Sequence, residues 1–255
     1  MCDFLGMRLV SAFQTVFRPD GEVIGREALL RASIPVQGAL TPNTAFDLAI
    51  ETDNLVLFDR LVRTLHVLNA GSFAKNELLF LNVHPRLLSN VSDHGRVFEQ
   101  ILDYHAIPTS AVVIEIQQAA VASDARLTEA VNNYRTLGYK IAVDDFGATY
   151  SGIVRIANPQ RRYASLVSEE DRAELNRVLA LRPDIVKLDS AVIRAAEKTA
   201  SAAAVIHGLV NIFHSNGAQV VIEGIETAGQ LALAHDTGAD FLQGYYLGFP
   251  HFLAK

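Results

Sequence analysis

The sequence contains a single cysteine, Cys2, so the chain cannot form an internal disulfide. Its cysteine and histidine residues nowhere show the spacing of a zinc site, which leaves oxygen atoms as the ligands of any metal. No uncharged apolar run approaches the roughly 20 residues of a membrane helix, and the first residues, MCDFLGMRLV, lack the regions of a signal peptide. We therefore expect a cytoplasmic protein without a membrane segment.

An excess of positive charge is also missing. The net charge of −6 argues against a nucleic-acid polymer as partner, although a small phosphate ligand could still bind through metals and a few cations. The sequence shows no exact internal repeat, low-complexity tract or interdomain linker. With 255 residues, half of them hydrophobic, the chain is expected to fold as one globular domain over residues 1–255.

A helix followed by a short apolar strand recurs six times along the sequence. Three of these units place a glycine between helix and strand, at Gly138, Gly217 and Gly238, where a left-handed residue commonly follows a helix. Alternating helices and near-continuous apolar strands predict a parallel sheet covered by helices. So many units favour an α/β fold of the TIM-like (β/α)8 barrel type over an open sheet.

The beginning of the chain departs from this rhythm. The segments MRLVSAFQTVF and EVIGREALL are joined by the turn residues RPDG, which is typical of an antiparallel hairpin. We therefore expect the first strand of the barrel to be irregular and antiparallel.

Polar residues stand where the predicted strands end. They are Glu27, Asn82, Glu115, Asp144, Asp145, Lys187, Glu223 and Gln243. Taken alone, an acidic residue at a strand end is more often a helix cap or a solvated loop residue. Together they are expected to share the rim where barrel proteins build active sites. Five carboxylates on one rim repel one another unless cations are bound, and hard oxygen ligands select Mg²⁺ or Mn²⁺.

A pair of such ions suits the hydrolysis of a phosphodiester. One ion activates water while both stabilise charge on the transferring phosphoryl group, and a shared carboxylate such as Asp144 could bridge them. Lys187 could orient or deprotonate that water, or neutralise a phosphate oxygen.

These motifs, taken in order, resemble the EAL domain family, bacterial phosphodiesterases that hydrolyse cyclic di-GMP to linear pGpG. Glu27-Ala28-Leu29 within REALLR looks like the signature of the family, and the resemblance continues through LNVHP, DDFG, VKLD, IEGIET and LQGYYLGFP. The match covers almost the whole chain. A lone Glu-Ala-Leu would be a weak signal, whereas this series is specific.

The resemblance implies two divalent cations and a role for each motif residue. The metal ligands would be Glu27, Asn82, Glu115 and Asp144 for one ion, and Asp144 and Asp145 for the other. The catalytic residues that fix or activate water would be Lys187, Glu223 and Gln243. Gln14 and Arg31 would contact the substrate, cyclic di-GMP.

One departure from the family falls beside the paired aspartates. Gln118 stands where the family has a glutamate that anchors the following loop, and that loop reads DFGATYSG, with Ala148 and Thr149 replacing Thr and Gly. An amide keeps hydrogen-bonding capacity but loses the negative charge. The changes could be a compensated pair or a joint decay. If the anchor is impaired, Gln118→Glu should raise activity.

Two functions therefore remain open at the level of sequence. The first is a metal-dependent cyclic di-GMP phosphodiesterase. The alternative is a weakened or inactive EAL domain that acts as a cyclic di-GMP receptor or protein-interaction module.

A segment at about 158–180 lies where the family usually has a short connection. Ser168, with Asp171 three residues later, resembles a helix N-cap, and the expected apolar stripe is Leu175, Val178 and Leu179. Nearby helices form dimer contacts in the family. A homodimer is therefore expected, with the inserted segment as either a solvated helical excursion or a site for a protein partner.

Overall fold

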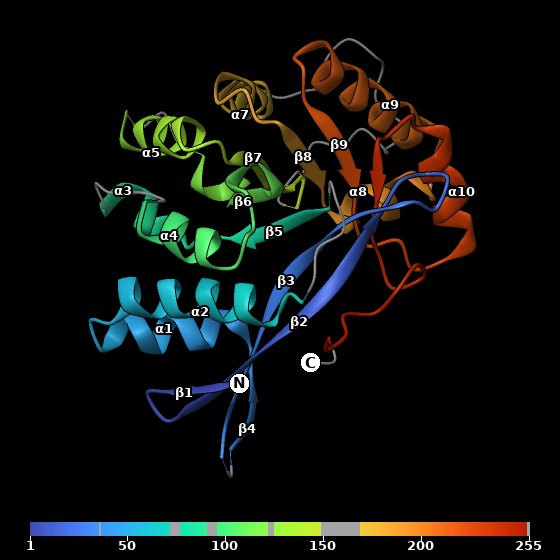
Figure 1. Ribbon diagram of the computed structural model, residues 1–255. Coiled ribbons are helices and arrows are strands. Elements are labelled where there is room, and N and C mark those ends of the chain that lie inside the picture. The colour runs from blue at the N-terminus through green and yellow to red at the C-terminus, as the bar shows by residue number, and fades with distance from the viewer. Residues whose placement is uncertain (36, 72–76, 91–95, 122–124, 149–168, 254–255) are drawn as a thin grey trace.

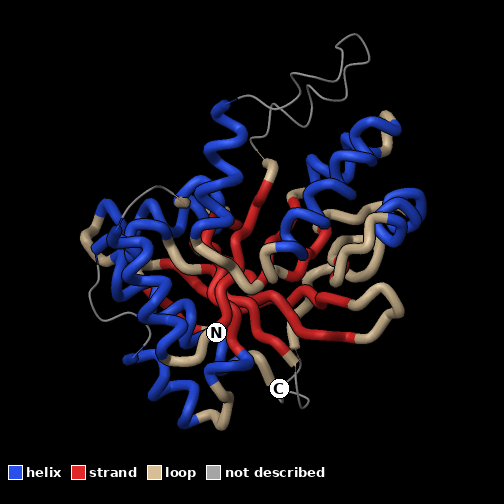
Figure 2. The backbone as a smooth tube through the Cα atoms, turned by 90° about the horizontal axis from the view of Figure 1, so that it is seen from above, coloured by secondary structure: helices blue, strands red, loops and turns tan. Residues whose placement is uncertain are grey.

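The computed structural model describes residues 1–35, 37–71, 77–90, 96–121, 125–148 and 169–253 (Figure 1). Its strands form a closed barrel of eight strands with helices around it (Figures 1 and 2). The strands of the barrel are β2 (Met7–Phe17), β3 (Val23–Ile34), β5 (Leu78–Asn82), β6 (Val112–Gln117), β7 (Lys140–Phe146), β8 (Ile185–Leu188), β9 (Gln219–Ile222) and β10 (Phe241–Leu242). The predicted TIM-like barrel is confirmed.

The first strand of the barrel is antiparallel, as predicted. β2 pairs antiparallel with both β3 and β10, whereas every pairing from β3 through β5 to β10 is parallel. The long β2–β3 hairpin extends past the barrel, where β1 (Cys2–Phe4) and β4 (Gly38–Leu40) add to its edges (Figure 1).

All six predicted helix-then-strand units are present. The helices are α1 (Pro42–Glu51), α2 (Leu55–Asn69), α3 (Pro85–Asn90), α4 (Arg96–Tyr104), α5 (Ala125–Thr136), α7 (Glu169–Ala180), α8 (Ser190–Ala196), α9 (Ala200–Ser215) and α10 (Ala228–Asp236), with short 3-10 turns η1 (Thr109–Ala111) and η2 (Gln118–Ala120). Gly138, Gly217 and Gly238 have φ of 90°, 83° and 77°, so each occupies the left-handed position that follows a helix.

The helix α7 accounts for the described part of the inserted segment. Val178 is buried, and Leu175 and Leu179 pack against the main hydrophobic core, which confirms the predicted apolar stripe. Ser168, the predicted cap, lies outside the described residues.

The hydrophobic core has two parts that matter for the site. The larger part lies between the helices and the outer surface of the barrel. A smaller cluster inside the barrel consists of Val16, Ile24, Phe80, Val113, Ala142, Ile185, Val221 and Phe241. Because it takes one side chain from nearly every strand, it closes the barrel interior and forms a floor beneath whatever lies above it.

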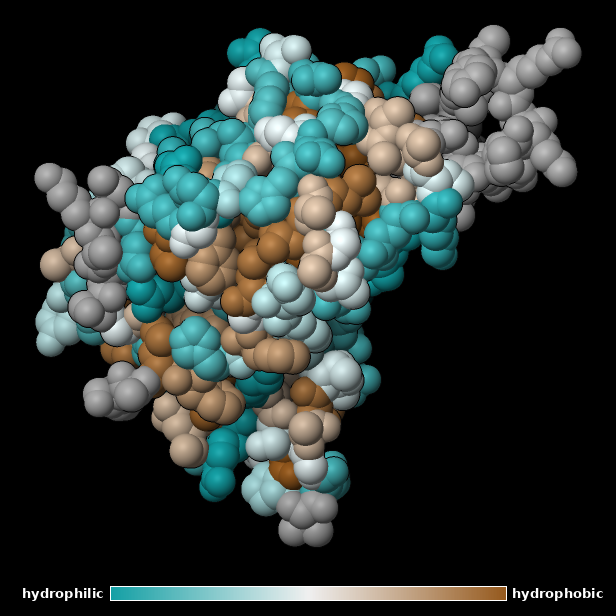
Figure 3. All heavy atoms as spheres, turned by 90° about the vertical axis from the view of Figure 1, so that its right-hand side faces the viewer, coloured by the Kyte–Doolittle hydropathy of each residue, from teal (hydrophilic) through white to brown (hydrophobic). Residues whose placement is uncertain are grey.

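Figure 3 views the molecule from the side of α9 and α10, where hydrophobic residues run through the middle of the face between hydrophilic ones. Among the helices that the structure describes, none is both long enough and apolar enough to cross a bilayer.

Candidate active site

The polar residues form a layer directly above the apolar floor. Phe80, Val113, Ala142, Ile185, Val221 and Phe241 of the floor are followed two positions later by Asn82, Glu115, Asp144, Lys187, Glu223 and Gln243. Side chains two residues apart along a strand share a face, so each strand that carries a floor residue inward also carries a polar residue inward. The polar layer therefore follows from the alternation of side chains along each strand.

Glu27 reaches the same layer from the middle of its strand. It faces Phe80 in the β3–β5 pairing and lies well before the end of β3 at Ile34. The expectation of a strand-end position is therefore wrong for Glu27. The reason is that β3 continues beyond the barrel as one arm of the hairpin, so its pairing with β5 ends long before the strand does.

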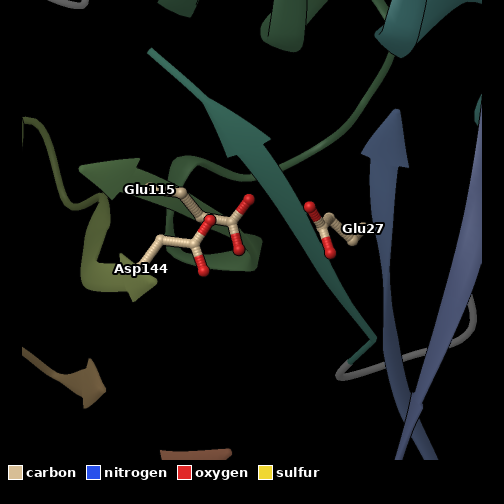
Figure 4. A group of neighbouring side chains, drawn as sticks. All are labelled: Glu27, Glu115 and Asp144. Carbon is tan, nitrogen blue, oxygen red and sulfur yellow. The ribbon is translucent and has the colours of Figure 1, made fainter. Parts of the chain in front are cut away.

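Three of the predicted metal ligands converge. Carboxylate oxygens of Glu27, Glu115 and Asp144 lie within 4.8 Å of one another, and their side chains point inward from β3, β6 and β7 (Figure 4). All three residues are buried. Oxygen atoms at such spacing can surround one hard cation.

Lys187 stands at the centre of the carboxylates. Its Nζ lies 2.7 Å from Glu115, 2.8 Å from Glu223, 3.1 Å from Asp144 and 3.2 Å from Glu27. The side chain is 1% exposed. One buried ammonium therefore faces four carboxylates, and the cluster carries an excess of negative charge.

The two consecutive aspartates share the mouth of the barrel because β7 is irregular there. The β7–β8 register shifts between Val143 and Phe146, and Asp145 has a φ of 58°. A left-handed residue at such a bulge interrupts the alternation that would send Asp145 to the opposite face. Aspartate tolerates this conformation better than most residues. As a result, Asp144, Asp145 and Glu223 bring carboxylate oxygens within 4.8 Å of one another.

Burial and the neighbouring charges together shift the pKa values of the cluster. Burial and then the nearby carboxylates raise the pKa of Glu115 well above its ordinary value, although Lys187 opposes the shift. Burial and then Asp144 raise the pKa of Asp145 to about 6. Burial alone would lower the pKa of Lys187, but the carboxylates together outweigh it and hold that pKa well above its ordinary value. Lys187 therefore stays charged.

Amide side chains connect the carboxylates. Gln243 Nε2 donates to Glu27 Oε2 over 2.8 Å, and Asn82 Nδ2 donates to Glu115 Oε2 over 3.0 Å. Asn82 therefore turns its amide nitrogen to the acidic group, so it could ligate a cation there only after its amide turned to present Oδ1. Gln14 is buried beside them and donates from Nε2 to the carbonyl of Gly248 over 3.1 Å.

Two pockets flank the acidic layer. One, of about 240 Å³, is lined by Gln14, Glu223, Gln243 and Tyr245 among others. The other, of about 280 Å³, has Asn82 in its wall, with residues of the hairpin and of α1 and α2. The layer thus lies between two concave spaces, and Gln14 lines one of them.

Arg31, the other residue predicted to contact substrate, is not drawn into the acidic layer. It lies four residues past Glu27 on β3, and so on the same face of the strand but further along the hairpin. Its Nη1 donates to the carbonyl of Leu30 over 3.0 Å.

Two glycines explain why the chain can pass so closely behind the polar layer. A Cβ on Gly244 would lie 2.2 Å from backbone atoms of Ile225. Gly224 has a φ of 64°, and a Cβ there would lie 2.2 Å from the Cβ of Ser190. Glu223 and Gln243 are each followed by a glycine because the neighbouring backbones leave no room for a side chain.

The loop anchor Gln118 lies at the start of η2 and is buried. Its Oε1 accepts a hydrogen bond of 2.7 Å from the backbone N–H of Gly147, in the turn after the paired aspartates. Its Nε2 donates to Glu174 Oε1 of α7. The amide therefore still holds the turn. Thr149 of the altered loop lies outside the described residues.

The sequence analysis missed two buried charged residues that contact the loop after β5. Asp59 and Arg63 of α2 are buried, and Asp59 Oδ1 accepts from the backbone N–H of His84 over 3.2 Å, just after Asn82. Opposite charges four residues apart on an apolar helix face were the available signal. Glu174 left no such signal, since only the fold brings it to Gln118.

A largely parallel barrel with carboxylates and a lysine gathered at one end of its interior defines the class of this protein, an α/β barrel with a polar site at that end. The model of the EAL domain family matches residues 4–160 and 169–250. The chain belongs to the EAL domain family.

Curated relatives are similar over part of their length. The cyclic di-GMP phosphodiesterase RocR of Pseudomonas aeruginosa is 27% identical over 259 residues, covering 94% of this chain and 59% of RocR. The probable cyclic di-GMP phosphodiesterase PdeA of Escherichia coli is 27% identical over 175 residues, covering 68% of this chain and 21% of PdeA. The chain thus spans only part of these relatives.

Solved structures share the fold. The MucR phosphodiesterase in complex with c-di-GMP has a TM-score of 0.73 at 25% identity, covering 95% of this chain and 92% of that one. Klebsiella pneumoniae BlrP1, in a complex with manganese and cyclic di-GMP, has a TM-score of 0.76 at 24% identity, covering 97% of this chain and 57% of that one.

Proposed function

We propose that this protein hydrolyses cyclic di-GMP to linear pGpG and that the reaction depends on two divalent cations, Mg²⁺ or Mn²⁺. The observation that carries the proposal is the layer of four carboxylates around one buried lysine, in a family whose named relatives include cyclic di-GMP phosphodiesterases.

The residues of the layer fit cations. Four carboxylates face one ammonium, and among the described residues Glu115 Oε1, Asp144 Oδ1 and Gln243 Oε1 are buried without a hydrogen-bond partner. The first two are met by the Lys187 ammonium, at 2.7 and 3.1 Å, but that one ammonium has three N–H groups for four carboxylates. Buried acceptors that lack donors are costly unless a cation or water meets them.

The ligands we propose follow from this arrangement. The first cation would be held by Glu27, Asn82, Glu115 and Asp144, and the second by Asp144 and Asp145, with Glu223 close enough to join them. When bound, such a pair supplies charge stabilisation for the phosphoryl group and lowers the pKa of water.

The side chains of the protein would then order the reaction. Water attacks phosphorus and gives up one proton, the bond from phosphorus to the ribose 3′ oxygen breaks, and that oxygen takes up a proton, which leaves a 5′-phosphate and a free 3′-hydroxyl. Lys187, which stays charged, supports a role as donor to a phosphate oxygen or to water, rather than as a base. Glu223 and Gln243 line one pocket and offer acceptors to the attacking water.

The pockets on both sides of the layer support a ligand with two similar halves joined through phosphate. A dinucleotide could place one nucleotide in each pocket and a phosphodiester over the carboxylates. Gln14 lies in one of these pockets. Arg31 remains a proposed contact on the hairpin.

The test is direct. Purified protein is incubated with cyclic di-GMP and Mn²⁺ or Mg²⁺, and the nucleotides are separated by chromatography. Formation of pGpG that a chelator stops is the expected result. Binding of cyclic di-GMP without turnover would support a receptor instead, and neither binding nor turnover would leave a protein-interaction module.

The receptor is the second candidate because Gln118 replaces the family glutamate and removes a charge beside the aspartates. The hydrogen bond from Gly147 to Gln118 favours the enzyme, since the turn keeps its anchor. The homodimer and a protein partner at 158–180 remain predictions, which light scattering and co-purification can check.

A further inference from the structure

The side chain of Gln118 joins three separate parts of the fold. It follows β6, which carries Glu115, and it accepts the backbone N–H of Gly147 in the turn after β7. It also donates to Glu174 in the middle of α7. Gln118 is 4% exposed, so water offers little competition for these two bonds.

The two contacts require an amide. Gly147 presents a donor and Glu174 an acceptor, so the residue between them must accept on one side and donate on the other. A carboxylate at position 118 could accept from Gly147, but it would meet Glu174 as a like charge without a proton to share. The family has a negative charge at the position of Gln118, whereas in this protein the negative charge lies on Glu174.

The helix that carries Glu174 is fixed to the barrel. Val178 of α7 is fully buried in the main core, with Leu175 and Leu179 packed against it. Just past the helix, Arg135 of α5 donates from Nη2 to the carbonyl oxygens of Leu181 and Arg182. Glu174 is therefore held in place from the core side, and it can hold Gln118 in turn.

The turn held in this way is next to the bulge. Gly147 lies two residues after Asp145, whose left-handed conformation brings it to the mouth of the barrel. We propose that Glu174 is a positioning residue for the active site, and that it acts through Gln118 on the Gly147 turn and so on Asp145. This inference rests on the proposed function, and it makes α7 part of the catalytic architecture.

The proposal reverses the expectation from sequence for one variant. Gln118→Glu should lower activity, because it loses the donor to Glu174 and adds a second charge beside it. In the exchanged pair, Gln118→Glu with Glu174→Gln, the side chain at position 118 still accepts from Gly147, and the new amide at position 174 donates to it. Both hydrogen bonds are thus restored, with the negative charge moved to position 118.

The experiment compares kcat, the KM for cyclic di-GMP and the apparent Mn²⁺ affinity of these proteins. Gln118→Glu is expected to lower kcat and Mn²⁺ affinity by about 10- to 100-fold at unchanged KM, as loss of an outer-sphere partner does. Glu174→Gln keeps a weaker bond and should lose about fivefold. The exchanged pair should return to within a few-fold of the wild type.

A matched control separates the contact from net charge. Glu129 is exposed on α5, so Gln118→Glu with Glu129→Gln has the same net charge as the exchanged pair but cannot restore the contact. It should stay as impaired as Gln118→Glu alone. Equal recovery in both double variants would overturn the proposal, as would a Gln118→Glu protein at least as active as the wild type.

Two further measurements keep the test decisive. If the wild type shows no turnover, the proposed function fails, but the order of Mn²⁺ affinities by calorimetry still tests the positioning role, and equal affinities overturn it. If Gln118→Glu does not fold, Glu174→Ala removes the partner without adding charge. That variant should lower kcat by about fivefold at unchanged KM, and an unchanged kcat contradicts the proposal.

Discussion

Two groups of charged residues, one on the helix α2 and one around Lys187 inside the barrel, differ in composition. In α2, Arg63 pairs with Asp59 through contacts of 2.7 and 2.6 Å, and Asp59 also accepts the backbone N–H of His84. One positive charge meets one negative charge. Around Lys187, by contrast, one positive charge meets four carboxylates.

The difference separates a structural pair from a site prepared for a ligand. Burial alone would lower the pKa of Arg63, but Asp59 raises it above its ordinary value, so the two charges balance each other within the protein. The carboxylates around Lys187 remain in excess, and burial together with the neighbouring carboxylates raises the pKa of both Glu115 and Asp145. Cations from solution would complete that group.

The strongest test of the comparison removes one carboxylate from the unbalanced group. Glu27→Ala should abolish pGpG formation, because Glu27 belongs to the proposed first cation site and accepts from Lys187 and Gln243. Chromatography of the nucleotides measures the loss. Glu22→Gln, an exposed acid on the same hairpin, should leave turnover unchanged. Turnover in a folded Glu27→Ala protein would contradict the assigned site.

Removing one charge from the Asp59–Arg63 pair should instead lower the stability of the folded protein. Asp59→Asn leaves Arg63 buried without its counter-charge, and we expect the free energy of unfolding to fall by about 3–5 kcal/mol. Urea denaturation measures it. The surface pair Arg18–Glu22 has the same spacing of four residues, and Glu22→Gln should cost at most about 1 kcal/mol. Similar losses in the two variants would show that burial does not distinguish the pairs.

Divalent cations should raise the stability of the protein only by binding to the carboxylates around Lys187. At Mn²⁺ concentrations about 100 times the dissociation constant, the wild type should gain about 2.7 kcal/mol of stability. The gain should persist in Asp59→Asn, whose site is intact, and shrink in Asp144→Asn, which alters the carboxylate shared by the two proposed cation positions. Thermal denaturation with and without Mn²⁺ measures it. An equal gain in both variants would place the cation elsewhere.

The smallest effect concerns His66, which lies near Arg63. Burial and then Arg63 lower the pKa of His66 from 6.5 to about 3. The unfolded chain therefore binds a proton below pH 6.5, which the folded chain takes up only near pH 3. Stability is fully present above pH 6.5 and falls as the pH decreases toward 3, by up to about 1.4 kcal/mol per pH unit.

Urea midpoints between pH 7.5 and 5 test this dependence. His66→Gln should flatten the decline relative to the wild type, whereas His235→Gln, at an exposed position, should keep the wild-type decline. Parallel declines in all three proteins would mean that His66 takes up its proton in the folded state as readily as in the unfolded state.

The sequence was sufficient for features that follow from periodicity. The six units, the antiparallel beginning and most of the polar layer could be predicted, because the carboxyl ends of parallel strands meet at one rim. The position of Glu27 could not, since the length of a hairpin arm beyond its barrel depends on tertiary pairing. Neither could the partner of Gln118, because Glu174 lies 56 residues away in the chain. The bulge at Asp145 was also hidden, since it appears only as a register shift in the pairing of β7 with β8.

The left-handed conformation of Asp145 in β7 affects how stably the two aspartates are held at the mouth of the barrel. A non-glycine residue in that region costs roughly 1 kcal/mol or more, which a regular strand would recover by turning Asp145 outward. The hydrogen bond from Gly147 to Gln118 contributes a net amount of about the same size. Whether both aspartates face the mouth of the barrel therefore depends on one or two hydrogen bonds, so a small displacement of α7, which holds Gln118 through Glu174, is enough to separate them.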